Sequence, residues 1–159
     1  MATRVIRVTP TGFAGTTDAS NQVVFNPTEI PGAVSANGKS ATIKSVTMID
    51  YNDNISKNMV YYFFQKGDND LGTLGAVIDI TDAELLANKF LGHITINGVG
   101  TGKGGDFILA TAGTFLETNS GVGVKAEFDS SSIYVAGVAA SSGRVSTASG
   151  LELVITLED

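Results

Sequence analysis

The glycine-rich segment Gly100–Gly105 is the first place where this sequence could hold a reactive ligand. Its residues fit the pattern G-x-G-x-x-G, and the segment follows the strand-like Ile94–Ile96. A dinucleotide site also needs a helix directly after the glycines, because the N-terminus of that helix faces the pyrophosphate. The next residues, Asp106–Thr111, instead have the pattern of another strand. We therefore interpret the segment as a loop and predict no cofactor.

Two turns carry oxygen ligands at spacings that resemble part of a calcium loop. The segment Asp50–Asn54 has Asp, Asn and Asn at the first, third and fifth positions. Ile55 replaces the expected glycine, and Tyr61 replaces the final carboxylate. The segment Asp68–Asp70 lies in a second turn bounded by glycines. Asp and Asn also suit ordinary turns, so we predict no metal site and leave ion binding by either loop open.

The sequence also shows no recognisable set of catalytic residues. His93 is the only histidine, and it alternates with Ile94 and Ile96, which predicts a place on the solvent face of a strand. The chain has no cysteine and no G-x-S-x-G segment, so thiolate chemistry and a nucleophile elbow are excluded. No pair among the 16 acidic residues stands out for glycosidase work. The sequence predicts a protein without catalytic residues, not an enzyme.

Composition points to the kind of scaffold that carries these residues. Charged residues make up only 16% of the chain, against roughly 25% in typical soluble domains. The formal charge of −6 argues against a nucleic-acid partner, because phosphate binding depends on clustered Lys and Arg. No apolar run reaches the length of a membrane span, and Met1–Val8 lacks the apolar stretch of a signal peptide. We therefore expect no membrane partner and synthesis in a cytoplasm without a signal peptide.

Period-two alternation of apolar and polar residues, broken by turn residues, dominates the chain. In Leu151–Glu158 four aliphatic residues fall on one face, and Val122–Asp129 alternates in the same way, with Phe128 on the apolar side. About ten short strands are expected, at Arg4–Pro10, Gln22–Phe25, Ser40–Tyr51, Asn58–Lys66, Ala76–Ile80, Gly92–Asn97, Phe107–Thr114, Val122–Asp129, Ser132–Ala139 and Leu151–Glu158.

One short helix interrupts the strands. Thr81 and Glu84 have capping-box spacing, which predicts a helix near residues 82–88. The pattern indicates an all-β protein with an antiparallel, jelly-roll-like β-sandwich, although other Greek keys share these cues. We expect a single domain, with an N-terminal strand or arm and loop over residues 1–20 and the sandwich over 21–159.

The segment Met59–Phe64 is apolar on both faces of its expected strand. Met59, Tyr61 and Phe63 lie on one face, and the alternate residues form the other. A two-layer sandwich has room for one such face in its core, so a loop, the short helix or another protein chain must cover the second. We take Met59, Tyr61 and Phe63 as a candidate interface. Arg4 and Arg7 are further candidates, for contact with an acidic partner surface.

Several segments resemble small structural proteins of tailed bacteriophage virions, from about residue 20 to the C-terminus. The segments that carry the resemblance are Glu29–Val34, Ala41–Asp53, the aromatic run ending at Gln65, Ser132–Val138 and Leu151–Asp159.

The resemblance implies a task as well as an origin. Proteins of this kind resemble capsid decoration (cement) proteins, which implies a homotrimer bound to the major capsid protein on the outside of the virion. It would also suit a head-fibre base or a tail component. A second hypothesis is a receptor- or carbohydrate-binding module of a virion, with the glycine-rich loop Asn97–Gly105 at its recognition end. The resemblance transfers no individual functional residue and implies no small-molecule ligand.

Overall fold

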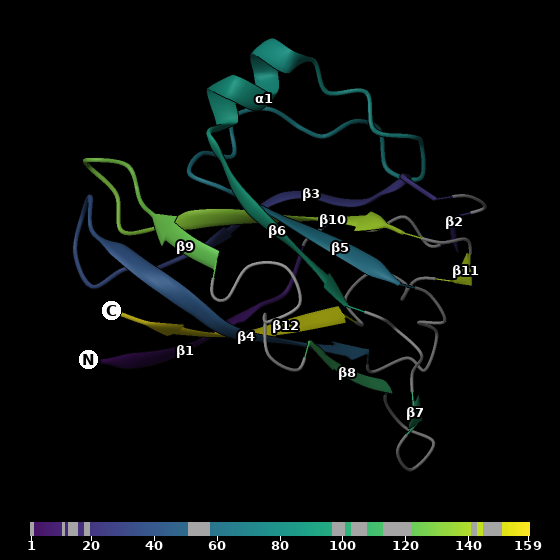
Figure 1. Ribbon diagram of the computed structural model, residues 1–159. Helices are drawn as coiled ribbons and strands as arrows, with labels where there is room; N and C mark the ends of the chain where they lie inside the picture. Colours follow the sequence, from purple (N-terminus) through teal and green to yellow (C-terminus); the bar gives the residue numbers. More distant parts are fainter. Residues whose placement is uncertain are drawn as a thin grey trace.

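The computed structural model of the protein is a layered β structure (Figure 1). It describes residues 2–10, 12, 16–17, 20–50, 58–96, 101–102, 108–112, 122–140, 143–144 and 151–159. The strands in these ranges are β1 (Thr3–Val8), β2 (Thr16–Thr17), β3 (Val23–Ile30), β4 (Ser40–Asp50), β5 (Met59–Phe64), β6 (Phe90–Ile96), β7 (Thr101–Gly102), β8 (Ile108–Ala112), β9 (Val122–Lys125), β10 (Ile133–Ala139), β11 (Gly143–Arg144) and β12 (Leu151–Glu158).

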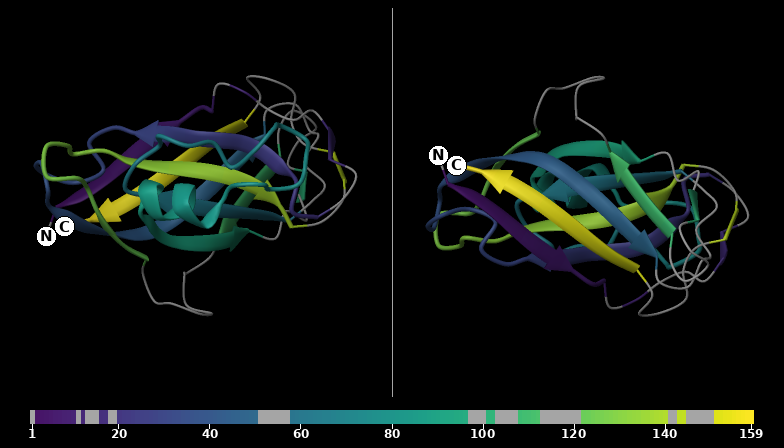
Figure 2. Two further views of the ribbon diagram at one scale, coloured as in Figure 1. Left: turned by 90° about the horizontal axis from the view of Figure 1, so that it is seen from above. Right: turned by 90° about the horizontal axis from the view of Figure 1, so that it is seen from below.

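The longer strands form two antiparallel sheets that face each other (Figures 1 and 2). In the first sheet β12 pairs with β1 on one side and with β4 on the other. The free side of β4 pairs with β9 along its first half and with β8 along its second half. The second sheet has the order β3-β10-β5-β6. At the edges β1 lies beside β3, and β6 lies beside β8 and β9, so the sheets approach each other along both sides.

The all-β sandwich expected from the sequence is confirmed, but the count of about ten strands is not. Because β8 and β9 lie end to end along β4, each sheet is four strands wide apart from the two-residue β7. Ala76–Ile80 is not a strand, and only Val77 makes an isolated bridge, to Gln22. Conversely β3 continues to Ile30 through Pro27. Proline is tolerated there because β3 is an edge strand and needs no donor on its outer side.

The main core lies between the two sheets. The inward side chains of β12 are Leu151, Leu153, Ile155 and Leu157, and all are fully buried. They meet the inward residues of the second sheet in one continuous cluster. This alternation is the one expected from the sequence, because residues at period two share one face of a strand. Apolar burial of this kind is the main stabilising term of such a fold.

The helix α1 (Asp82–Asn88) has the predicted bounds and the predicted cap. The hydroxyl of Thr81 accepts a hydrogen bond from the backbone N–H of Glu84, and the Glu84 carboxylate accepts one from the N–H of Thr81. These two bonds satisfy donors that a helix N-terminus otherwise leaves unpaired. The Thr81 backbone N–H and hydroxyl both donate to the Glu84 carboxylate, and they lower the pKa of Glu84 because they stabilise its charged form.

A third layer covers the outer face of the second sheet, and we call it the flap (residues 65–89). It consists of a long loop and α1, and it lies above β3, β10 and β5 in Figure 1. A second apolar cluster lies beneath it, where Leu71 packs with Phe64 and Val138. The central strand β10 is therefore buried on both faces. The flap explains how an aromatic strand can be apolar on both sides.

Two asparagine side chains fasten the flap. The Asn26 amide donates to the carbonyl of Gly72 and accepts from the N–H of Leu71, at 2.9 and 2.8 Å. Asn88 is fully buried, donates to the carbonyl of Asn69 at 2.7 Å and accepts from the Asn69 backbone N–H at 3.0 Å. Because every polar atom of a buried amide needs a partner, these bonds fix the path of the loop over the sheet.

The two ends of the chain lie side by side at one end of the sandwich (Figures 1 and 2). The strand β1 is antiparallel to β12, with Thr3 opposite Glu158, and the N–H of Asp159 donates to the carbonyl of Ala2. The N-terminal strand therefore belongs to the same sandwich as the rest of the chain, and not to a separate arm.

Candidate functional site

The three aromatic-strand residues predicted as an interface are core residues of their own chain. Met59, Tyr61 and Phe63 have no exposed surface and lie in the cluster between the sheets. The ring of Tyr61 packs against that of Phe25, with centroids 6.1 Å apart. The interface prediction is corrected here, because side chains without exposed area cannot touch a partner while the sandwich is intact. The opposite face of β5 is the one covered by the flap.

Burial of Tyr61 has a consequence for its acidity. Its hydroxyl donates to the sulfur of Met48, and loss of contact with water raises the pKa of the phenol far above its ordinary value near 10. Desolvation has this effect because it penalises the charged phenolate.

We expect the free energy of unfolding to fall as the pH rises above about 10. The unfolded chain then releases the Tyr61 proton while the folded chain keeps it, which costs about 1.4 kcal/mol per pH unit. Urea unfolding between pH 8 and 11 measures this slope. In Tyr61→Phe the slope should be shallower, and equal slopes in the two proteins would contradict a buried, protonated phenol.

Arg4 and Arg7 lie on β1 and are bonded to acids of the same chain. Arg4 pairs with Asp159, at 2.6 Å for one of its bonds, and also donates to the carbonyl of Ala33 at 3.0 Å. This pairing lowers the pKa of the Asp159 carboxyl. Arg7 is more exposed and pairs with Glu152. Both arginines hold β1 against β12, and their contact with an acidic partner stays a prediction.

The residues considered for chemistry are spread over the molecule. His93 is exposed on the outer face of β6, as predicted, opposite Tyr62. Asp68 and Asp70 are exposed on the flap. Within the described ranges no three His, Cys, Asp or Glu residues come close enough to hold a metal ion. The Asp50–Asn54 loop beyond Asp50, and all of the Gly100–Gly105 loop except the two residues of β7, lie outside the described residues.

Six large apolar side chains are exposed in the described parts of the chain: Val5, Leu74, Val77, Leu86, Phe90 and Phe128. The sequence predicted that Phe128 continues the buried face of the strand at Val122–Asp129. This prediction is wrong, because Phe128 is 92% exposed. The strand ends at Lys125, and a turn follows in which the N–H of Ser130 donates to the carbonyl of Glu127. Sequence alternation missed this change because Phe128 keeps the period of the strand after the strand has ended.

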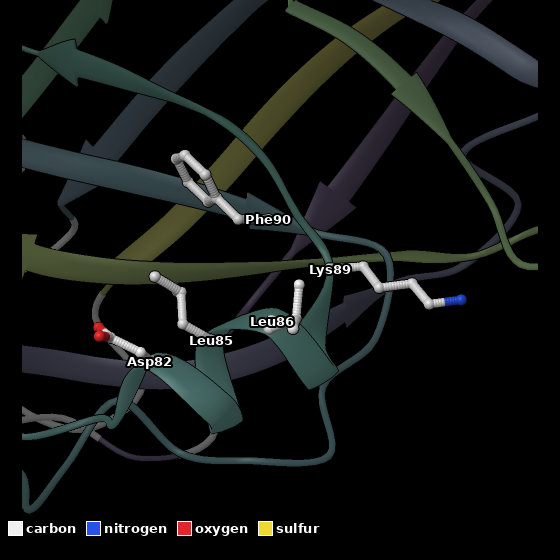
Figure 3. A pocket seen from close by; sticks show the side chains of 5 residues that line it. All are labelled: Asp82, Leu85, Leu86, Lys89 and Phe90. Carbon is white, nitrogen blue, oxygen red and sulfur yellow. The ribbon is translucent and has the colours of Figure 1, made fainter.

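A shallow, open hollow of about 440 Å³ lies between α1 and the start of β6 (Figure 3). It is lined by Asp82, Leu85, Leu86, Lys89 and Phe90. Lys89 points away from the other four side chains in Figure 3, and its ammonium pairs with Glu127 at 2.7 Å. The hollow therefore offers an apolar floor with one carboxylate at its rim.

An aromatic cluster adjoins this hollow on the outer face of the sheet. The Phe90 ring packs against Phe64 and Tyr62, with centroids 5.8 and 5.9 Å apart, and Tyr62 in turn contacts His93 at 6.0 Å. Phe90 is 44% exposed. The edge of this cluster thus presents half-covered rings beside a histidine, and this arrangement was not found from the sequence.

No protein-family model, curated protein or solved structure matches this chain. Among the described helices none is long and apolar enough to cross a membrane.

Proposed function

We propose that this protein is a non-enzymatic structural protein of a tailed-bacteriophage virion, a decoration protein that binds and stabilises the capsid lattice from outside. In this role it is a homotrimer and its partner is the major capsid protein. The proposal starts from the resemblance of Ala41–Asp53, Ser132–Val138 and Leu151–Asp159 to such proteins. It requires a rigid, soluble scaffold with apolar surface left for association, and no chemistry.

The strand order supports the finer proposal that the sandwich is a jelly roll. Counting β8 and β9 as one interrupted strand, the orders are β1-β12-β4-β8 and β3-β10-β5-β6. Most consecutive strands thus alternate between the sheets, and the first strand pairs with the last. Eight strands wound through two sheets in this way are the arrangement of jelly rolls, which occur in viral capsid and lectin domains.

The observation that carries the proposal is the nature of the exposed surface. Phe128 stands almost fully exposed at the tip of a turn, and Leu86 is 79% exposed on α1. The hollow beside α1 is shallow and open, whereas small-molecule sites bury most of their ligand. Exposed aromatic and aliphatic side chains on a rigid scaffold suit contact with a protein surface.

Addition of the purified chain to capsid shells that lack it should raise their melting temperature. A ligand that binds only the assembled lattice stabilises it by about 2.7 kcal/mol per site at a hundredfold excess over Kd. Co-sedimentation measures the binding, and calorimetry of the shells measures the stabilisation. Bovine serum albumin at equal concentration is the control. Failure to co-sediment with shells at any concentration tested would refute the proposal.

The homotrimer is tested separately by light scattering during gel filtration. A trimer has three times the chain mass of 16.4 kDa. A monomeric mass at all concentrations would refute the proposed trimer. Lattice binding would then still be tested by co-sedimentation with capsid shells.

The aromatic cluster beside Phe90 favours a second candidate, a carbohydrate-binding module of a virion. Sugar rings stack on exposed aromatic faces with polar groups nearby, and Phe90 lies with Tyr62 next to His93 and Asp82. If this candidate is right, a glycan array should show selective binding that Phe90→Ala weakens at least about tenfold. Phe128→Ala, at a ring outside this cluster, is the control. A blank array would eliminate the candidate.

A further inference from the structure

The flap is apolar on both of its faces, although only the inner one is needed to cover the sheet. Its inner residues Leu71, Ile78, Ile80 and Leu85 pack on the second sheet. Its outer side chains Leu74, Val77 and Leu86 are 39%, 57% and 79% exposed. The flap thus carries three of the six large exposed apolar side chains of the described surface.

The flap is also acidic. Between residues 65 and 89 it has five acids and two bases, a formal charge of −3, which is half of the −6 of the whole chain. All five acids are exposed, and none takes part in an ion pair within the described residues. They are Asp68, Asp70, Asp79, Asp82 and Glu84.

The opposite outer face of the sandwich is different, because its charges are balanced locally. On the first sheet Arg7 pairs with Glu152 and Lys44 pairs with Glu158. Those acids already have cations beside them and gain less from a basic partner. Most of the exposed acids without an ion pair in the described residues therefore lie on the flap, together with half of the exposed large apolar side chains.

We propose that the outer surface of the flap is the docking surface of this protein, and that its occupant is a basic and apolar surface of the capsid lattice. The inference rests on the proposed function and adds which side of the molecule faces the shell. Two flaps facing each other would bring like charges together, which opposes self-association through this surface. A cationic surface instead neutralises the acids while its apolar residues cover Val77 and Leu86.

Matched variants test the surface on shells of the phage that encodes this chain. Val77→Ser combined with Leu86→Ser should weaken co-sedimentation at least about tenfold. Val5→Ser removes a side chain of similar exposure (61% against 57%) from the other sheet and should bind as the wild type does. Asp70→Lys should weaken binding and Asp129→Lys should not, and binding should weaken with added salt. Circular dichroism confirms that each variant is folded.

The outcomes separate the inference from the function on which it rests. If the wild type binds and the flap variants bind equally well, the flap is not the docking surface and the proposed function stands. If the flap variants change the mass of the trimer, the flap is a contact between copies and the inference is wrong.

If the wild type does not bind shells, the proposed function fails. A second probe then tests whether the flap binds a basic, apolar protein surface. That probe is a short amphipathic peptide of leucine and lysine, titrated into ¹⁵N-labelled protein. Shifts confined to flap residues, and lost in the Val77 and Leu86 double variant, support a docking surface for basic apolar protein. Shifts centred on β1, β12 and β4, or no shifts, overturn it.

Discussion

Tyr61→Asp should remove a large part of the stability of the fold. The wild-type phenol is fully buried between the sheets, so aspartate would place a carboxylate among apolar side chains without a charged partner. Such a replacement also removes a ring that packs on Phe25. Together these losses should cost at least about 4 kcal/mol, out of the roughly 5–15 kcal/mol of a typical domain. Near-UV circular dichroism and urea unfolding measure the result.

Tyr61→Phe is the matched control, because it keeps the ring and removes only the hydroxyl that bonds Met48. We expect a loss of about 1 kcal/mol, the usual net value of one hydrogen bond. If Tyr61→Asp folds as stably as Tyr61→Phe, then Tyr61 is exposed in solution. That result would return it to the list of interface residues.

Gly137→Ala should destabilise the protein strongly, although it adds only one methyl group. Gly137 lies in the central strand β10, where the register with β3 shifts on either side of it. A β-carbon there would lie 2.2 Å from the Phe25 ring, far inside any real contact distance. Phe25 is 1% exposed and lies in the main core, so its ring can move only by displacing other core side chains. Overpacking of this kind should cost about 3 kcal/mol.

Gly123→Ala provides the comparison, since it adds the same methyl group to a strand. A β-carbon at Gly123 meets nothing within 4 Å, so the change should alter stability by less than about 1 kcal/mol. Thermal unfolding of both variants compares the two sites directly. Equal melting temperatures would show that Phe25 does not pack on β10 as described.

Local patterns predicted those elements whose determinants are close together in the chain. The helix at residues 82–88 could be predicted because its cap depends only on Thr81 and Glu84, which are three residues apart. The face of β12 was found because period two is an intrinsic property of a strand. The strand expected at Ala76–Ile80 failed because Ile78 and Ile80 face the second sheet from a loop. Burial produced the apolar pattern there without strand pairing.

The candidate interface failed for a different reason. Alternation divides Met59–Phe64 into two faces but gives no sign of which face lies between the sheets. That choice depends on Leu71 and Leu85, which cover one side from the flap. Asn26 and Asn69, 43 residues apart in sequence, help to fix that cover through their bonds to the loop and to Asn88. Contacts between residues so distant in sequence have no signature in local spacing.

The side-by-side position of the chain ends suits the protein to carry fused passenger domains. Ala2 and Asp159 are joined by a backbone hydrogen bond at one end of the sandwich, in the sheet farther from α1 (Figure 1). A passenger domain fused to either end would leave the scaffold at the same place, away from the flap. If the flap faces the shell as proposed, particles coated with such fusions would display the passenger outward, and two different passengers on one chain would be presented as neighbours.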